Sequence, residues 1–206
     1  MNPRFWLAFF LLEAALSATP GPAVFTIVGQ GIAGGWRRAF WGGLGIEAAN
    51  LAYFVLSALG VGAFLAGAPR VVLALKLAGI GYLGWTAVRL LLARGGAARE
   101  VRAAAGGRGA AFKQALATQL GNPKAVVFFA SLLAPFIDLE APWPVPAQLA
   151  VYAATTVATE LPILVVYGWV AGRGGALFPE GRVGPWPDRV AGACLLAVAG
   201  WLLLRG

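Results

Sequence analysis

Ionisable side chains inside long apolar stretches are the residues of this 206-residue chain that could do chemistry. An acid or a base at mid-bilayer costs roughly 2.5–3.5 kcal/mol, so such residues are expected to face one another or a water-filled cavity. Histidine is absent, which removes the commonest general base and metal ligand. The single cysteine excludes an internal disulfide and a C-x-x-C redox motif. The ionisable residues in apolar stretches are Glu13, Glu47, Lys76, Lys124 and Glu160.

A buried carboxyl group can bind an ammonium group or carry a proton across a membrane. We interpret Glu47 and Glu160 as ligands for a substrate ammonium group or for a proton, and Glu13 as a further candidate for proton or ion coupling. Lys124 is the candidate partner of a substrate carboxylate. The simpler interpretation is structural: the glutamates pair with lysines, and Lys76 and Lys124 extend to the membrane interface.

Prolines interrupt the first and the fourth of the apolar stretches, at Pro20-Gly21-Pro22 and at Asn122-Pro123. A proline lacks the N–H that would bond the carbonyl four residues earlier, and it disfavours helix at the residue before it. In hydrocarbon each freed carbonyl needs a partner or a wet cavity. Discontinuous membrane helices of this kind mark binding sites in transporters.

Two broken helices that share a cavity suit a zwitterion. Helix N-termini carry partial positive charge and free N–H groups, which favour a carboxylate, whereas freed carbonyls and helix C-termini favour an ammonium group. An amino acid is the simplest such molecule, so we expect the site near mid-membrane between the two interruptions. The expected substrate-binding residues are Thr19, Pro20, Gly21, Pro22, Glu47, Asn122, Pro123, Lys124 and Glu160.

Composition indicates an all-α integral membrane protein without a soluble domain. Hydrophobic residues make up 60% of the chain and charged residues 12%, and the mean hydropathy is +0.77. Soluble domains average about 25% charged residues, and about 20 apolar residues cross a bilayer. The stretches that we expect to span the membrane are Phe5–Val28, Phe40–Phe64, Val71–Leu92, Phe112–Phe136, Val145–Val170 and Val190–Leu204.

The net charge of +8 does not indicate nucleic-acid binding, because the basic residues lie between the spans rather than on a soluble face. Loops that carry many Lys and Arg residues stay in the cytoplasm. This rule puts both termini outside and the basic loops after spans one, three and five inside. The basic residues of those loops and their flanks are Arg37, Arg38, Arg94, Arg99, Arg102, Arg108, Lys113, Arg173, Arg182 and Arg189.

The six spans divide into two halves of three, about 1–92 and 112–206, joined by a cytoplasmic linker at about 93–111. An odd number of spans per half makes the halves enter the membrane from opposite sides. Broken helices one and four then stand in corresponding places, as in transporters with inverted repeats. Glycines in spans three and six permit close helix packing, within the chain or in a homodimer. The linker alternatively forms a basic helix on anionic lipid.

Several motifs in order resemble the LysE/RhtB family of amino-acid exporters. They are Thr19-Pro20-Gly21-Pro22, the segment from Lys76 to Leu83, Asn122-Pro123-Lys124, Phe128-Phe129 and Pro135-Phe136. The resemblance covers nearly the whole chain. It implies a multi-pass protein of the bacterial cytoplasmic membrane that exports amino acids or close derivatives, driven by the proton gradient, and it does not name the amino acid.

We therefore expect a secondary transporter that works by proton antiport, with no cofactor, no metal site and no catalytic residue. An exporter of inorganic cations is the alternative, because carboxylates and freed carbonyls also bind hard cations. A membrane enzyme is disfavoured because no nucleophile and base stand at a suitable spacing. A purely structural subunit does not account for the buried charges.

Overall fold

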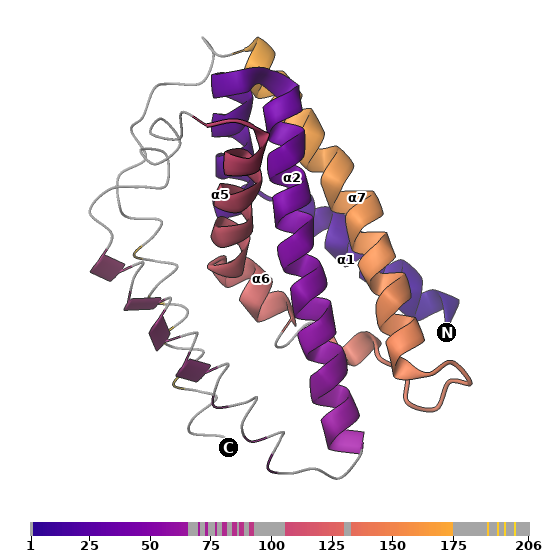
Figure 1. Cartoon of the computed structure of the whole chain (residues 1–206). Helices are drawn as coiled ribbons and strands as arrows, with labels where there is room; N and C mark the ends of the chain where they lie inside the picture. The colour runs from indigo at the N-terminus through magenta and orange to yellow at the C-terminus, as the bar shows by residue number, and fades with distance from the viewer. Residues whose placement is uncertain are drawn as a thin grey trace.

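The computed structural model describes residues 2–65, 106–129 and 133–174, together with scattered helical positions between 70 and 92 and between 189 and 200. All regular structure in these residues is helical (Figure 1). The third and sixth expected spans, with Lys76 and Cys194, lie largely outside the described residues, as does most of the expected linker. The arrangement of six helices as two inverted repeats therefore stays a prediction.

Helix α1 runs from Pro3 to Ala18 and ends at the first interruption expected from the sequence. Asn2 caps its start by accepting a hydrogen bond from the backbone N–H of Arg4 at 2.9 Å, and Pro3 occupies a first-turn position that needs no N–H. Thr19 leaves the helix in an extended conformation. The two prolines that follow it explain why the first span breaks here.

Helix α2, Pro22–Leu65, is two helical segments joined by a tight turn. Gly34 and Gly35 are non-helical, and Gly35 has φ of 68°, a left-handed conformation that glycine adopts without strain. The first segment continues past Val28 to the turn, and the second starts before Phe40. Both predicted ends were thus placed too far from the turn, because the polar residues Gln30, Arg37 and Arg38 lie within the helices rather than in the loop between them.

The second interruption separates α5, Arg108–Leu120, from the short α6, Pro123–Val127. Asn122 caps α6 by accepting a hydrogen bond from the backbone N–H of Lys124 at 3.1 Å. Helix α5 begins before the predicted Phe112, inside the range assigned to the linker. A short 3-10 turn, η2, follows at Ala134–Phe136.

Helix α7, Val145–Arg173, retains Pro162 in its interior. Two stretches of the described residues are long and apolar enough to cross a membrane, Pro22–Gly62 and Val145–Arg173. The first of these includes the glycine turn, so it is a helical hairpin rather than one rod. Its second segment and α7 are the two long helices of the described bundle.

Helix α2 lies between α5 and α7, and α1 packs against α7 (Figure 1). Glycines let these helices approach closely. A Cβ on Gly45 of α2 would meet the carbonyl oxygen of Phe112 in α5, and a Cβ on Gly31 would meet the backbone of Gly168 in α7. Such contacts without side chains are the usual means of close helix packing in membranes.

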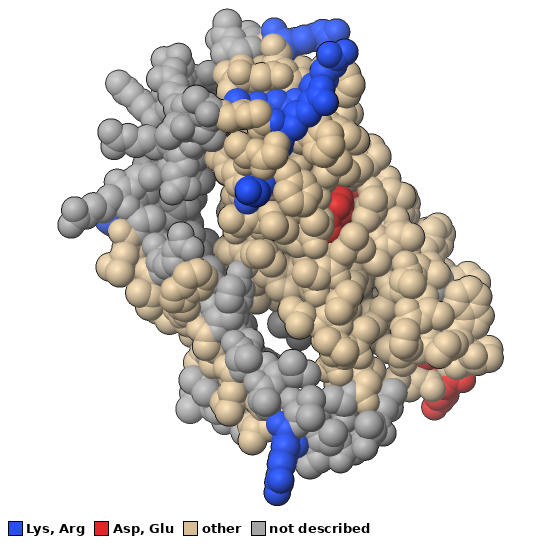
Figure 2. Space-filling view, in the orientation of Figure 1, with Lys and Arg blue, Asp and Glu red and all other residues tan. Residues whose placement is uncertain are grey.

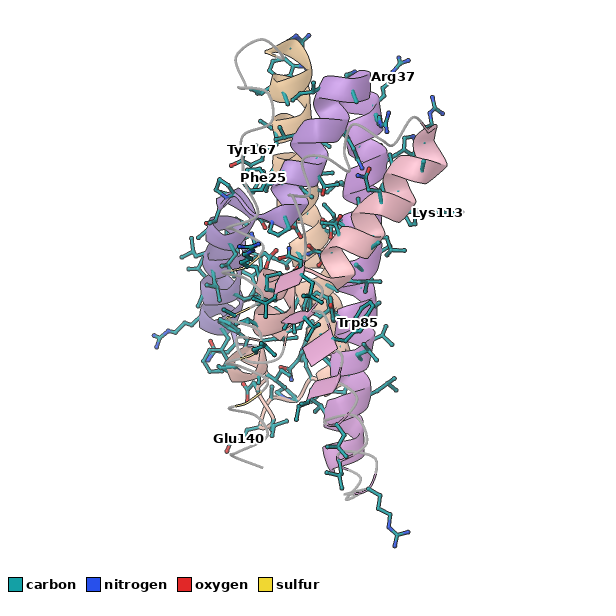
Figure 3. All side chains as sticks on the ribbon, turned by 90° about the vertical axis from the view of Figure 1, so that its left-hand side faces the viewer. Phe25, Arg37, Trp85, Lys113, Glu140 and Tyr167 are labelled. Carbon is teal, nitrogen blue, oxygen red and sulfur yellow. The ribbon has the colours of Figure 1, made fainter. Side chains whose placement is uncertain are left out.

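The charged side chains separate along the length of the bundle. Basic residues gather at the end that holds the α2 turn, the start of α5 and the end of α7 (Figure 2). Figure 3 places Arg37 and Lys113 toward this end and Glu140 at the opposite one. Aromatic residues pair with the basic ones: the Arg173 guanidinium lies 4.0 Å from the centre of the Trp169 ring.

Candidate functional site

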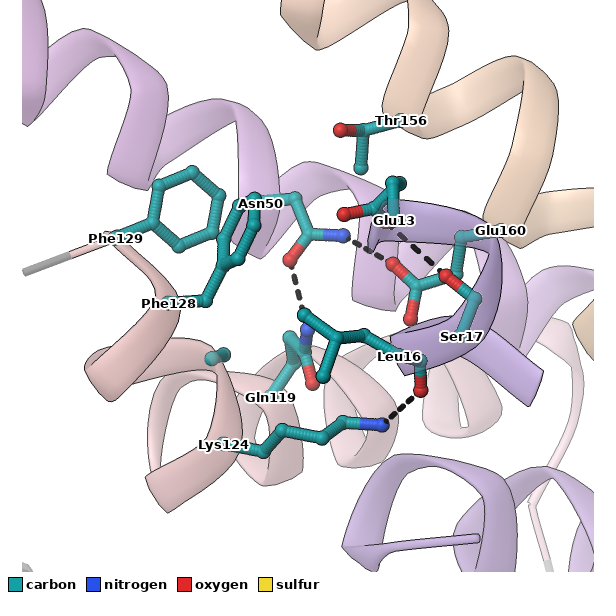
Figure 4. Close-up of a pocket in the computed structure, with 11 residues that line it drawn as sticks. Glu13, Leu16, Ser17, Asn50, Gln119, Lys124, Phe128, Phe129, Thr156 and Glu160 are labelled. Atoms are coloured by element: carbon teal, nitrogen blue, oxygen red, sulfur yellow. Dashed lines mark hydrogen bonds between the residues drawn. The ribbon is translucent and has the colours of Figure 1, made fainter. Parts of the chain in front are cut away.

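A small cavity lies where the two interrupted helices meet, deep in the bundle (Figure 4). Four helical elements contribute to it: α1, α2, α7 and the broken α5–α6 segment. One side of the wall is polar and the other is apolar. The lining residues are Glu13, Leu16, Ser17, Asn50, Gln119, Lys124, Ala125, Phe128, Phe129, Thr156 and Glu160.

Two of the predicted carboxyl groups face this cavity from different helices. Glu13 of α1 is 5% exposed and Glu160 of α7 is 6% exposed. The Ser17 hydroxyl, one turn along α1, donates to Glu13 Oε1 at 3.1 Å. Helix positions i and i+4 share a face, so α1 presents its carboxyl and hydroxyl groups to the cavity together.

Asn50 joins the carboxyl groups of α2 and α7 through one amide. Its Nδ2 donates to Glu160 Oε2 at 2.6 Å and to Glu47 Oε2 at 3.3 Å. Its Oδ1 accepts from Gln119 Nε2 at 2.7 Å. Glu47 therefore belongs to the same polar network, although it lies behind Asn50 and does not line the cavity.

The network continues through amides to the second interruption. Asn122 Nδ2 donates to Gln119 Oε1 at 2.8 Å, and Asn122 is fully buried. Asn122 Oδ1 in turn accepts from the Lys124 backbone N–H. A line of hydrogen bonds thus connects Glu160 with the first turn of α6, so that the carboxyl group and the helix start are held in fixed relation.

The Lys124 side chain reaches the first interruption. Its Nζ donates to the carbonyl oxygen of Leu16 at 2.6 Å (Figure 4) and to that of Thr19 at 3.1 Å. Pro20 frees the Leu16 carbonyl, and a cation at a helix C-terminus also opposes the partial negative charge there. The two broken helices, which lie about one hundred residues apart in sequence, are therefore in contact.

The other carbonyls at the interruptions also have partners in the chain. The Tyr167 hydroxyl donates to Ala18 O and the Tyr53 hydroxyl to Leu120 O, each at 2.7 Å. The Asn122 N–H donates to Gln119 O at 3.0 Å. We expected freed carbonyls to bind substrate directly. In this conformation side chains and nearby N–H groups satisfy them instead, as a low-polarity setting demands.

The predicted residues thus divide into three groups. Glu13, Lys124 and Glu160 line the cavity, and Thr19 offers its carbonyl oxygen to Lys124. Glu47 and Asn122 lie one hydrogen bond behind the lining. The remaining residues break the helices: Pro20, Gly21, Pro22 and Pro123. Gly21 also lies close to the ammonium group, since a Cβ there would be 3.9 Å from Lys124 Nζ.

Sequence reasoning missed four polar residues of the wall: Ser17, Asn50, Gln119 and Thr156. Three of them carry a simple signal. Ser17 stands four residues after Glu13, Asn50 three after Glu47, and Thr156 four before Glu160. Residues at these spacings share a helix face, so each predicted glutamate marked the helix face that holds its polar neighbour.

Thr156 differs from the other threonines of its helix. Thr155 and Thr159 donate their hydroxyl protons to carbonyls one turn earlier, at 2.8 Å each. The Thr156 hydroxyl oxygen is buried and has no hydrogen-bond partner among the described residues. It is therefore a polar group at the cavity wall that remains available to a ligand.

The cavity has a volume of about 30 Å³. A buried water needs on the order of 10–15 Å³ measured in this way, so the space suits about two waters. Its apolar side is formed by Leu16, Ala125 and two aromatic residues in edge-to-face contact, Phe128 and Phe129, whose ring centres lie 5.1 Å apart. Even glycine is larger than two waters, so the wall must move to admit an amino acid.

Comparison with known proteins agrees with these features. The family model described as LysE type translocator matches residues 14–206. The chain belongs to the LysE family. No solved structure matches it. The LysE-family assignment confirms the resemblance stated from the proline motifs, and it makes this chain a membrane translocator.

Two LysE-family relatives have names that state a substrate. A homoserine/homoserine lactone efflux protein of Salmonella typhimurium is 29% identical over 173 residues, which cover 84% of this chain and 83% of the relative. A leucine efflux protein of Klebsiella pneumoniae is 27% identical over 143 residues, which cover 68% of this chain and 66% of the relative. A membrane protein of Vibrio cholerae with no stated substrate is 27% identical over 172 residues.

Proposed function

We propose that this protein exports amino acids or close derivatives from the bacterial cytoplasm through the cavity between its two broken helices. The observation that carries the proposal is the composition of that cavity. It combines two carboxyl groups, an ammonium group and several amides and hydroxyls around one small space. Efflux of homoserine or leucine by relatives of similar length supports the same class of substrate.

The polar wall can hold both charged ends of a zwitterion. Glu13 and Glu160 can accept hydrogen bonds from a substrate ammonium group, and the Asn50 amide fixes the position of Glu160. The Lys124 ammonium group is the one cationic side chain of the lining and suits the carboxylate. Phe128 and Phe129 offer an apolar surface to the side chain, in keeping with neutral substrates.

Proton antiport fits the same residues. A carboxyl group of the cavity releases its proton when a substrate ammonium group arrives, and takes a proton from the outside when the substrate leaves. The carboxylate is therefore paired either with a proton or with the substrate ammonium group. It is never left unpaired in the membrane, where an isolated charge is most costly. Glu160 is the best placed, because it contacts both the cavity and the amide network.

Export from loaded proteoliposomes tests this function. Vesicles that contain the purified protein are loaded with labelled leucine or homoserine, and release is followed with and without an imposed proton gradient. Glu160→Gln should lower the gradient-driven rate at least about tenfold, because loss of a charged partner worth at least ~1.4 kcal/mol corresponds to that factor. Glu140→Gln, which changes an exposed carboxyl group of the outer loop, is the matched control.

Wild-type protein that releases none of the amino acids would contradict the proposal. Release of divalent cations under the same gradient would point to the cation exporter instead. Unchanged release by both Glu160→Gln and Glu13→Gln would remove the carboxyl groups from the mechanism while leaving amino-acid export in place.

A further inference from the structure

The acceptors that bind the Lys124 ammonium group would also suit the ammonium group of a substrate. The Lys124 group has two carbonyl acceptors, Leu16 O and Thr19 O, at the C-terminus of α1. Glu13 and Glu160 line the same cavity. Carbonyl oxygens at a helix end together with carboxyl groups are what any primary ammonium group requires.

The cavity cannot hold an amino acid beside the Lys124 ammonium group. Its volume of about 30 Å³ fits about two waters, and Phe128 and Phe129 close its apolar side. Gly21 lies next to the ammonium group, so the first interruption already touches it. A substrate that brings its own ammonium group must therefore displace Lys124 or enlarge the wall.

Resting on the proposed export function, we propose that Lys124 is an internal substitute for the substrate ammonium group, which leaves the α1 carbonyls when substrate binds and pairs with the substrate carboxylate. The swap needs no unpaired charge, because one ammonium group replaces another at the carbonyls. It also breaks the two hydrogen bonds that Lys124 Nζ donates from the second interruption to the carbonyls of the first. Binding is thereby coupled to movement of one broken helix against the other.

The same swap sets the substrate class. A zwitterion of zero net charge supplies one ammonium group for the carbonyls and one carboxylate for the displaced lysine. A substrate with a second cationic group would place three positive groups against Glu13 and Glu160 in a space of low polarity, where like charges repel strongly. The protein should therefore accept neutral amino acids and exclude basic ones, and Lys124 is the residue that makes this distinction.

A truncated lysine tests the substitute role directly. Lys124→Ala removes the propylammonium portion of the side chain. The Thr19 carbonyl then loses the donor that Lys124 supplied, and the Leu16 carbonyl keeps only the Thr19 N–H, at 3.1 Å. Propylammonium should then bind the purified variant and raise its melting temperature by about 3 °C or more at saturating concentration. It should leave the wild-type protein and Lys113→Ala unchanged, since Lys113 is an exposed lysine of α5. n-Propanol is the uncharged control probe.

A second variant covers the case in which Lys124→Ala does not fold. Lys124→Met keeps a side chain of four heavy atoms and removes only the charged nitrogen, so the ammonium ion is the probe that fits the vacated carbonyls. Stabilisation of either variant, but not of the wild type, supports the proposal. Equal shifts in wild type and variants, or no shift in either variant, would overturn it.

Transport measurements separate this proposal from the function on which it rests. Proteoliposomes with wild-type protein should exchange leucine and should not exchange lysine, whereas Lys124→Met should gain lysine exchange and lose at least about tenfold of its leucine rate. If wild-type protein exchanges leucine and lysine equally, the substitute role is wrong and export stands. If it exchanges no amino acid, export is wrong, and the propylammonium and ammonium shifts still report on the site.

Discussion

Asn50 is the residue that allows carboxyl groups of two helices to lie together. Its side-chain amide donates to Glu47 and Glu160 and accepts from Gln119. It is 2% exposed, so water cannot replace these bonds. A single hydrogen bond between membrane helices is worth only about 0.6 kcal/mol on average, and the cost of losing several at once is what makes this position sensitive.

We therefore expect Asn50→Ala to lower the free energy of unfolding by about 2 kcal/mol, because three buried polar groups lose their partner together. Thermal unfolding of the detergent-purified protein measures the change. Ser57→Ala on the same helix is the control: its hydroxyl bonds only a carbonyl of its own helix, that of Tyr53, at 2.9 Å, and we expect a change below about 0.5 kcal/mol. Equal losses in the two variants would show that the amide network does not hold α2 to α7.

At the scale of elements, close approach of helices puts the polar residues within reach of one another. Asn50 can reach Gln119 because α2 and α5 meet along a glycine surface, at which a Cβ on Gly45 would collide with Phe112 O. Prolines shape the other side of the site, where α1 ends at Ala18 and α6 begins at Pro123. The hydrogen bond between Asn50 and Gln119 therefore depends on the close contact of α2 with α5 at Gly45.

Gly45→Ala should push α5 away from α2 and lower the free energy of unfolding by about 1–3 kcal/mol, the usual cost of overpacking. Because the shift also lengthens the Asn50–Gln119 bond, we expect export to fall with stability. Gly60→Ala on the same helix meets no atom within 4 Å and should be neutral or stabilising, since alanine favours helix. Thermal unfolding and proteoliposome export of both variants check this. A Gly45→Ala protein as stable as Gly60→Ala would contradict the close contact.

For the whole molecule, the separation of charges along the bundle indicates its orientation. Arg37, Arg108, Lys113 and Arg173 belong to one end, and Glu140 to the other. Basic loops remain in the cytoplasm, so we expect the α2 turn to face inward and the loop before α7 to face outward. Export then means that substrate enters from the end with the arginines, which also repels cations and agrees with a zwitterionic substrate.

Labelling of introduced cysteines tests this orientation. In a Cys194→Ala background, Glu140→Cys should react with a membrane-impermeant maleimide added to intact cells. Lys113→Cys should react only after the membrane is made permeable, because we expect the first turns of α5 to lie on the cytoplasmic side. The reverse pattern would overturn the orientation and with it the direction of transport assigned to the cavity.

Parts of the site could be predicted from the sequence because an ionisable residue inside an apolar stretch is conspicuous by itself. A glutamate in an apolar span needs a polar neighbour, which is why the sequence pointed to Glu13 and Glu160, and the structure places both at the cavity. The partner of Lys124 could not be predicted in this way. Both the carbonyls at the first interruption and a substrate carboxylate satisfy an ammonium group, and the choice depends on where the helices cross.

The sequence by itself determined the apolar spans, the two interruptions and the buried ionisable residues, because hydropathy and the missing proline N–H act locally along the chain. Only the tertiary structure decided that Lys124 reaches Leu16, that Asn50 joins Glu47 to Glu160, and that the cavity between them is small. These contacts join residues up to about one hundred positions apart. They follow from the packing of glycine surfaces between helices, which no local pattern encodes.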